Sequence, residues 1–489
     1  MSKSPPNPNS FPAFLRSSGK PIVFILLLAL ILRVVLVVWF PAVAGDENRY
    51  AVPAVNMLHG HGFSSDLQEP YGPTMAAVPL YPLFVAAVYR VFGENTLAVR
   101  IAQGLLDLLT SLLVAFVSFN LAPASLKRRS AISSFAIYGC LSWFTVLWTR
   151  YILTETLALF LTMLAIAIGM IALKRGGWVW AVAGAICGLA LMDRPDSLLL
   201  VLAFVLVLAV KFVRHRSTQV IGQALLFSCA LIAVLIPWTL RNYVAFRQFQ
   251  PLASEYGFAN AEYMPIGYLR WIRTWITDET YFDVFTPAFQ PGSEPFDPMK
   301  LPSNVFDSPE ERAQVVRLMS DYRREKKFSA EMNAGFETIA DARIHRAPLR
   351  FFIWLPLKRI LSVWLTGFAT TNPLHRLVRI LLVLPILIGG IAGFVLGAGN
   401  RTVTGLLVLM VLTRTVFLGY HYAPESRYIV EAYPAMIAAC GITCAVLWFH
   451  CHRRFGRVES KIGRVRLSRE KTRSELLRQH RADQEGKSA

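Results

Sequence analysis

Charged residues are scarce in this sequence, because Asp, Glu, Lys and Arg together make up 17% of its 489 residues. A soluble protein carries about 25% of these residues, so the composition excludes an ordinary soluble domain. Hydrophobic residues account for 54% of the chain. We find no persuasive alternating strand pattern and no internal repeat in the sequence. The composition therefore predicts an all-α protein of the membrane.

Cysteine is also rare, and the chain has six, namely Cys140, Cys187, Cys229, Cys440, Cys444 and Cys451. None falls in a segment predicted to lie outside the cell, so we expect no disulfide. Their spacing matches no zinc site. His59 and His61 stand two apart in a glycine-rich loop, but the spacing offers no third ligand. We expect no metal and no other cofactor.

Long apolar runs are what the chain has in abundance. About 20 residues at 1.5 Å each cross a hydrocarbon core of roughly 30 Å. Such runs lie at 21–40, 97–121, 131–149, 152–173, 178–192, 197–213, 219–240, 376–397, 402–419 and 428–449. Ala42-Val43-Ala44 resembles a signal-peptidase site, but the run before it is longer than the 7–15 residues of a signal peptide. We therefore expect an uncleaved first span and about ten spans in all.

Basic residues give the orientation of these spans. They cluster in short loops at 127–129, 174–175 and 211–216, which the positive-inside rule places in the cytoplasm. An even number of spans then leaves both termini inside and the acidic segments outside. The net charge of +19 is explained by these loops and the tail, so no nucleic-acid partner is expected. For the basic stretch 464–481, a helix on anionic lipids and a solvated end both stay open, and we favour the second.

The predicted organisation has five parts. They are a cytoplasmic N-terminus (1–20), a transmembrane module (21–240) with a first exterior loop (41–96), an exterior insert with an interfacial helix (241–375), C-terminal transmembrane helices (376–449) and a basic cytoplasmic tail (450–489). Residues 351–368 are apolar but contain Lys358 and Arg359, so we place them flat on the outer interface. Short helices are predicted around 50–58, 79–92 and 307–332, and a loop over 285–302.

Two adjacent carboxylates, Asp46 and Glu47, follow the first span directly. A charge within the hydrocarbon costs roughly 2.5–3.5 kcal/mol, so ionisable groups at a membrane usually have a task. An acidic pair at the surface suits a general base that acts on a lipid-anchored substrate. Capping of the next helix is an equal alternative for this pair. Asp107, inside a span, is a weaker functional candidate.

Arginines at the outer ends of the spans are the candidate phosphate-binding groups: Arg150, Arg194, Arg241 and Arg427. A guanidinium holds phosphate oxygens with a bidentate fork. Contact with lipid headgroups is the alternative for each of them. Glu155 could orient a substrate or pair with an arginine, and a local ion pair or cap explains Asp193 and Asp196.

Four motifs carry a family resemblance. They are Asp46-Glu47-Asn48-Arg49-Tyr50 followed by Gly60-His61-Gly62-Phe63, then Arg150 with Thr154-Glu155, then Pro237-Trp238 with Arg241-Asn242-Tyr243, and finally Arg427-Tyr428 with Tyr433-Pro434. In this order the chain resembles the GT-C superfamily of membrane glycosyltransferases, specifically the bacterial relatives of protein O-mannosyltransferases and of lipid A aminoarabinose transferases.

The resemblance implies a fold and a place. The fold would be a GT-C-like bundle of about ten or more transmembrane helices with interfacial helices and an exterior, periplasmic insert. The protein would lie in the bacterial cytoplasmic (inner) membrane, among membrane lipids, with its site facing the periplasm.

The resemblance also implies an inverting transfer of a sugar from a polyprenyl-phosphate-linked donor to an acceptor hydroxyl on a glycan, a lipid or a protein. Asp46 would be the base and Glu47 its neighbour. Substrate would be held by Arg150, Glu155, Arg194, Arg241, Asn242, Arg427 and Tyr428. A transporter or flippase, and an oligosaccharide ligase or polymerase, are the alternatives. An exterior cavity that joins Asp46, Glu155 and Arg241 would favour transfer. Neither the sugar nor the acceptor follows from the sequence.

Overall fold

The computed structural model describes residues 10–253, 265–289, 292–366, 372–397 and 401–451. Throughout these ranges the regular structure is helical, and no strand is formed. The predicted tail, including its basic stretch at 464–481, lies almost wholly outside the described residues, as do residues 1–9. The all-α prediction is confirmed.

Eight helices among the described residues are long and apolar enough to cross a membrane. They are α2 (Gly19–Trp39), α5 (Thr96–Leu121), α8 (Glu155–Arg175), Pro195–His215 with α10 (Leu198–His215), α11 (Thr218–Phe246), α17 (Pro373–Leu396), α18 (Arg401–Tyr420) and the last helix, Ser426–Cys451. The chain is therefore a multi-pass membrane protein.

Two of the ten predicted spans differ from this set. Residues 127–150 form two helical pieces, Lys127–Leu141 and Trp143–Arg150, which are bent by 55°. The other is α9 (Val179–Asp193), whose 15 residues reach only about 22 Å, less than the hydrocarbon core. It packs very closely on α11, because a Cβ atom at Gly184 would lie 2.0 Å from the carbonyl oxygen of Phe227. The prediction of ten full spans is reduced to eight, or nine with the bent pair.

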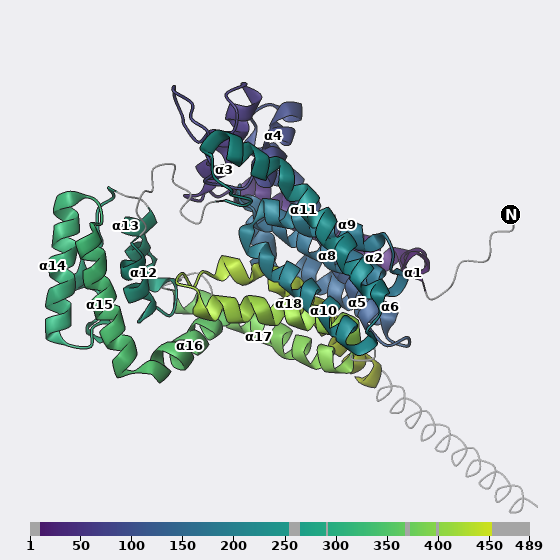
Figure 1. Ribbon diagram of the computed structural model, residues 1–489. Coiled ribbons are helices and arrows are strands. Elements are labelled where there is room, and N and C mark those ends of the chain that lie inside the picture. The colour runs from purple at the N-terminus through teal and green to yellow at the C-terminus, as the bar shows by residue number, and fades with distance from the viewer. Residues whose placement is uncertain (1–9, 254–264, 290–291, 367–371, 398–400, 452–489) are drawn as a thin grey trace, which may run out of the picture.

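The three basic loops meet at one end of the bundle. Arg128 donates a hydrogen bond of 3.0 Å to the carbonyl of Ser17. Lys174 donates a bond of 2.9 Å to Asn120, which lies beside the first loop. Lys211 donates one of 2.9 Å to Gln223, whose amide lies close to Gly176 beside the second loop. Figure 1 shows α1 (Phe11–Ser17) and α6 (Lys127–Ala136) at this end. We call it the basic end, and the opposite one the site end.

The first exterior loop contains the two short helices expected there, α3 (Glu47–Leu58) and α4 (Leu80–Phe92). Ala54 of α3 and Tyr81 and Val85 of α4 share one buried apolar cluster with Ile152. Asn56 ties down the loop between the helices with bonds of 2.9 Å to the carbonyls of Ser64 and Asp66. The loop is thus fixed to the site end of the bundle.

The segment predicted as the exterior insert is a second helical unit that stands beside the bundle (Figure 1). Its helices are α12 (Ile266–Arg273), η4 (Glu279–Phe285), α13 (Thr286–Phe289), η5 (Pro298–Lys300), η6 (Ser303–Val305), α14 (Pro309–Glu325) and α15 (Ala330–Arg346). An aromatic core holds them together, with Tyr268, Trp271 and Phe336 at its centre. The predicted helix over 307–332 is divided at Lys326, whose φ of 56° ends α14. Short helices also interrupt the loop predicted over 285–302.

The segment that returns to the bundle contains η7 (Arg350–Trp354), α16 (Leu355–Leu361) and η8 (Ser362–Thr366). No span of membrane length is found there among the described residues. One face exposes Phe352, Trp354, Leu357 and Leu361. On the other face Arg359 is fully buried and donates to the carbonyls of Ile276 and Gly419. An interfacial position is compatible with this amphipathic character and stays a prediction.

A buried ionic cluster connects three membrane helices inside the bundle. Arg33 of α2 forms an ion pair with Asp107 of α5, and Tyr138 of the bent pair donates a bond of 2.7 Å to the same carboxylate. Arg33 also donates to the carbonyls of Ala29 (2.9 Å) and Gly139 (2.7 Å). Because the carboxylate and the guanidinium both have partners here, packing explains Asp107 without a further role.

Candidate active site

Asp46 lies between the site end of α2 and the first turn of α3. Its side chain is 42% exposed, and Oδ2 accepts a hydrogen bond of 2.7 Å from Arg427. Asp46 occupies the N-cap position of α3, yet its side chain makes no capping hydrogen bond. Burial would raise the pKa of Asp46, but the charge and the hydrogen bond of Arg427 outweigh it and hold that pKa below the ordinary value. The capping alternative does not hold for this residue.

Arg427 sits between two carboxylates at the start of the last helix. Besides Asp46 it pairs with Glu425, and its own side chain is 20% exposed. Burial raises the pKa of Glu425, although Arg427 opposes this effect. The arginine therefore has solvent access together with two acidic neighbours.

A second arginine cluster lies directly behind the first. Arg194 pairs with Glu155 and Asp196 at 3.0 Å each and with Glu431 at 3.5 Å. Arg414 of α18 pairs with Asp196 at 2.9 Å and with Glu431 at 2.7 Å. Sequence reasoning named Arg194 and Glu155 but missed Arg414 and Glu431. The available signal was an ionisable side chain inside an apolar span.

Tyr428 joins the two clusters. The guanidinium groups of Arg194 and Arg427 each lie 5.2 Å from the centre of its ring. A cation within about 6 Å of an aromatic ring is attracted to its face. The backbone carbonyl of Tyr428 also accepts a bond of 2.6 Å from Arg414. The structure thus brings together four predicted site residues from distant segments: Asp46, Arg194, Arg427 and Tyr428, with Glu155 bound to Arg194.

Carboxylates outnumber guanidinium groups in this double cluster. Asp193 is buried and neither of its carboxylate oxygens has a hydrogen bond, while Glu155 leaves Oε2 without one.

Among the described residues, no group of three or more His, Cys, Asp or Glu side chains is arranged to hold a metal ion. His59 pairs at 3.0 Å with Glu94, and both side chains are about half exposed.

Glu47 and Arg150 are turned to other partners. Glu47 is buried, and its Oε1 accepts a bond of 3.0 Å from the backbone N–H of Ile152. Arg150 donates to the hydroxyl of Tyr151 at 3.3 Å and lies over that ring. The carboxylate of Glu47 thus fastens α3 to the segment before α8, which makes it a support for Asp46.

Arg241 and Asn242 hold the first exterior loop against α11. Arg241 donates to the carbonyls of Thr74 (2.6 Å) and Phe63 (3.0 Å) and lies 4.8 Å from the ring centre of Trp238. Asn242 is buried and donates to the carbonyl of Gln250 at 2.8 Å. Arg241 and Asn242 were predicted to bind substrate. In the structure both side chains instead donate hydrogen bonds to the protein's own backbone.

A cavity of about 750 Å³ lies beside Arg241, between α3, α4, α9 and α11. Its wall is mostly apolar and aromatic, and includes Phe63, Leu83, Met192 and Trp238. Neither Asp46 nor Glu155 lines it, so this cavity does not join the three residues that we expected in one space.

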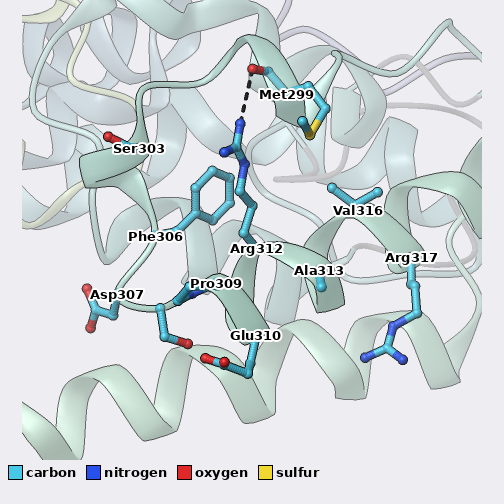
Figure 2. A pocket seen from close by; sticks show the side chains of 11 residues that line it. Met299, Ser303, Phe306, Asp307, Pro309, Glu310, Arg312, Ala313, Val316 and Arg317 are labelled. Atoms are coloured by element: carbon cyan, nitrogen blue, oxygen red, sulfur yellow. Dashed lines mark hydrogen bonds between the residues drawn. The ribbon is translucent and has the colours of Figure 1, made fainter.

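A second cavity, of about 860 Å³, lies in the exterior insert. Figure 2 shows Phe306 and Arg312 side by side, and Arg312 donates a bond of 3.3 Å to the carbonyl of Met299. Asp307, Glu310 and Arg317 add charges of both signs around it. Asp307, two residues before α14, is itself paired with Arg343 of α15 and with Arg350, which follows α15.

Part of the chain matches a known protein family. Residues 73–239 match the family model of dolichyl-phosphate-mannose-protein mannosyltransferases. The match covers roughly one third of the chain and contains Arg150, Glu155 and Arg194 but neither Asp46 nor Arg427. No curated protein matches the chain.

The chain is also similar to solved membrane enzymes. One is an Archaeoglobus fulgidus oligosaccharyltransferase tethered to an acceptor peptide, with a TM-score of 0.52 and 12% identity, over 90% of this chain and 51% of that one. The fold is GT-C-like. ArnT from Cupriavidus metallidurans, bound to undecaprenyl phosphate, is 14% identical with a TM-score of 0.38, over 86% of this chain and 78% of that one. This chain thus spans about half the length of the oligosaccharyltransferase.

Proposed function

We propose that this protein is an inverting glycosyltransferase that moves a sugar from a polyprenyl-phosphate-linked donor to an acceptor hydroxyl at the exterior face of the cytoplasmic membrane. The observation that carries the proposal is the Asp46–Arg427 pair, a partly exposed carboxylate beside a partly exposed guanidinium where membrane helices end. The similarity of residues 73–239 to mannosyltransferases that use a lipid-phosphate-linked sugar supports the same reaction class.

The reaction needs one base and one site for a leaving phosphate. The acceptor oxygen attacks the anomeric carbon, its proton passes to Asp46, and the bond between that carbon and the phosphate oxygen breaks. The lipid phosphate leaves with the electron pair of that bond, stabilised by Arg427 and, behind the ring of Tyr428, by the charge of Arg194. A phosphate leaves without a general acid, so a second proton donor is not needed.

The ion pair gives the proposal an order of events. While Arg427 holds Asp46, the pKa of Asp46 lies below its ordinary value and the carboxylate is a weak base. A donor phosphate that engages Arg427 draws the positive charge away from Asp46. The pKa of Asp46 then rises, because the two largest influences that lower it, the charge and the hydrogen bond of Arg427, are withdrawn. Donor binding would thus prepare the base for the acceptor.

The apolar cavity beside Arg241 is the proposed place for part of the polyprenyl chain. Its volume of about 750 Å³ and its aromatic and aliphatic walls suit isoprene units. We assign Arg241 and Asn242 to shaping this wall, since their described hydrogen bonds go to the exterior loop and to Gln250.

A transfer assay with purified protein tests the proposal. Radiolabelled polyprenyl-phosphate sugars serve as donors, and release of the lipid phosphate is measured. Asp46→Asn should lower release by about 10²–10⁴-fold while the protein remains folded. Glu94→Gln, which alters an exposed carboxylate of the same exterior region, should release lipid phosphate like the wild type. We expect transfer to persist in EDTA.

Two results would replace this proposal. Donor that crosses the bilayer unchanged, with no lipid phosphate released, would favour the transporter or flippase. Release of a lipid diphosphate from a diphosphate-linked donor would favour the oligosaccharide ligase or polymerase. The buried Arg33–Asp107–Tyr138 cluster speaks against transport, since its charges are satisfied by the protein.

A further inference from the structure

Glu279 reaches from the exterior insert into the candidate active site. It is the first residue of η4, is 8% exposed, and its Oε1 accepts a hydrogen bond from the backbone N–H of Ser426, 147 residues further along the chain. Ser426 is immediately followed by Arg427. A side chain of the insert is thus bonded to the residue before the proposed phosphate-binding arginine.

The hydrogen bond gives a partner to a backbone N–H group at the start of a helix. The first four N–H groups of a helix have no partner within that helix, and Ser426 begins the last one. The N-cap residue, Glu425, makes no capping bond with its side chain, which pairs with Arg427. A carboxylate at this end is also favoured by the helix dipole. Glu279 therefore caps the last helix from another part of the molecule.

The insert is fastened to the same segment at further points. Arg359 links the carbonyls of Ile276 and Gly419. Ala423 is part of the buried core of the insert, and the rings of Phe285 and Tyr422 lie 6.2 Å apart. The insert thus contacts the connection between α18 and the last helix up to the residue before Arg427.

We propose that Glu279 is a positioning residue, which fixes the start of the last helix so that the guanidinium of Arg427 lies between Glu425 and Asp46. The exterior insert then sets the geometry of the site instead of only covering it. This inference rests on the proposed function for the role of Arg427 in transfer, but the positioning itself is independent of any reaction.

The test combines stability with turnover. The variants are Glu279→Ala, Glu279→Gln, Arg427→Ala and the double variant Glu279→Ala/Arg427→Ala, with Glu337→Gln as the matched control. Glu337 forms a 3.2 Å ion pair with Arg270 in the same insert, and its side chain is 47% exposed. If Glu279→Ala does not fold, Glu279→Asp replaces it in both the single and the double variant, since it is one methylene shorter.

The expected results follow from the hydrogen bond. Glu279→Ala should lower kcat by about 10²-fold, because a small displacement of a charge-stabilising group costs that much, and KM for the acceptor should stay unchanged. With Arg427 displaced, the pKa of Asp46 in the free enzyme rises, so the acid limb of the pH profile of kcat/KM should move to higher pH. Glu279→Gln retains an acceptor oxygen and should restore both quantities. Glu337→Gln should change neither.

The thermal shifts of the Glu279→Ala and Arg427→Ala variants should not be additive, because residues that act on one another couple. Additive shifts would overturn the positioning role, whether or not the protein transfers a sugar. An equal loss of kcat in Glu279→Ala and Glu279→Gln would overturn it as well. If the wild type releases no lipid phosphate while the shifts are non-additive, the proposed function fails and the positioning role stands.

Discussion

Two arginine–aspartate pairs in this molecule have the same chemistry and different surroundings. Arg33 and Asp107 are buried in the bundle, with the carboxylate also held by Tyr138. Asp46 is 42% exposed, and among the described residues no hydrogen bond reaches its Oδ1. A pair whose carboxylate is bonded at both oxygens by the protein stabilises the fold. A pair with capacity left over is available to a ligand.

The largest expected effect concerns the buried pair. Asp107→Ala leaves the charge of Arg33 buried without a counter-ion, which should lower the free energy of unfolding by roughly 3–5 kcal/mol. Thermal unfolding in detergent measures this loss. Asp46→Ala is the matched control and should lower the unfolding temperature at neutral pH much less than Asp107→Ala does. Equal destabilisation by the two variants would remove the distinction between the pairs.

A substitution in the exposed Asp46–Arg427 pair should lower turnover. Arg427→Ala should lower the transfer rate by about 10²–10³-fold, since a group that stabilises developing charge is lost. It also removes the influence that lowers the pKa of Asp46, so that pKa should rise. The activity of the variant should therefore fall at a higher pH than that of the wild type as the solution is acidified. A pH profile of kcat/KM, which reports the free enzyme, that keeps its wild-type acid limb would contradict the pairing.

The stability of the protein should also depend on the protonation state of Asp46. The pKa of Asp46 is depressed in the folded protein, so its contribution to stability is present above the ordinary pKa and is lost as pH falls through the folded value. Unfolding temperatures of wild type and Asp46→Asn should therefore converge in acid. A constant difference between them down to pH 3 would be inconsistent with the depressed pKa.

Glu47 should give a smaller effect on stability than Asp107. Glu47→Ala leaves the buried N–H of Ile152 without its acceptor, which should cost about 1–3 kcal/mol. Glu47→Gln keeps the oxygen and should recover most of this loss in thermal unfolding. A fall in turnover of Glu47→Gln as large as that of Asp46→Asn would instead assign Glu47 to the chemistry.

The exposed His59–Glu94 pair should give the smallest effect. Exposed ion pairs contribute about 0–1 kcal/mol, so His59→Ala should barely change the unfolding temperature or the transfer rate. A marked loss of transfer in this variant would place the exterior loop in substrate binding.

Much of the architecture followed from the sequence because apolar length and charge are visible in it. The helices α3 and α4 and the common end of the basic loops were all predictable from periodicity and the positive-inside rule. The short span α9 and the bend before Trp143 were not, because both depend on packing against neighbouring helices.

The candidate site was predictable in part. Motifs placed Asp46, Arg194 and Arg427 on one side of the membrane, and the structure brings them together through Tyr428. The motifs could not show that Arg241 donates hydrogen bonds to the carbonyls of Phe63 and Thr74. Backbone partners of this kind depend on loop conformation, which residue spacing does not determine.

The bond between Arg33 and the carbonyl of Gly139 has a consequence for how the protein is made. The carbonyl lies in a π-helical turn, Ile137–Leu141, and its guanidinium partner comes from α2, which is synthesised about a hundred residues earlier. During synthesis α2 must therefore enter the bilayer with an unpaired arginine, at a cost of roughly 2.5–3.5 kcal/mol. An 18-residue stretch of α2 has a mean hydropathy of 3.1, the highest such value among the eight helices, which offsets this cost until Asp107 and Gly139 follow.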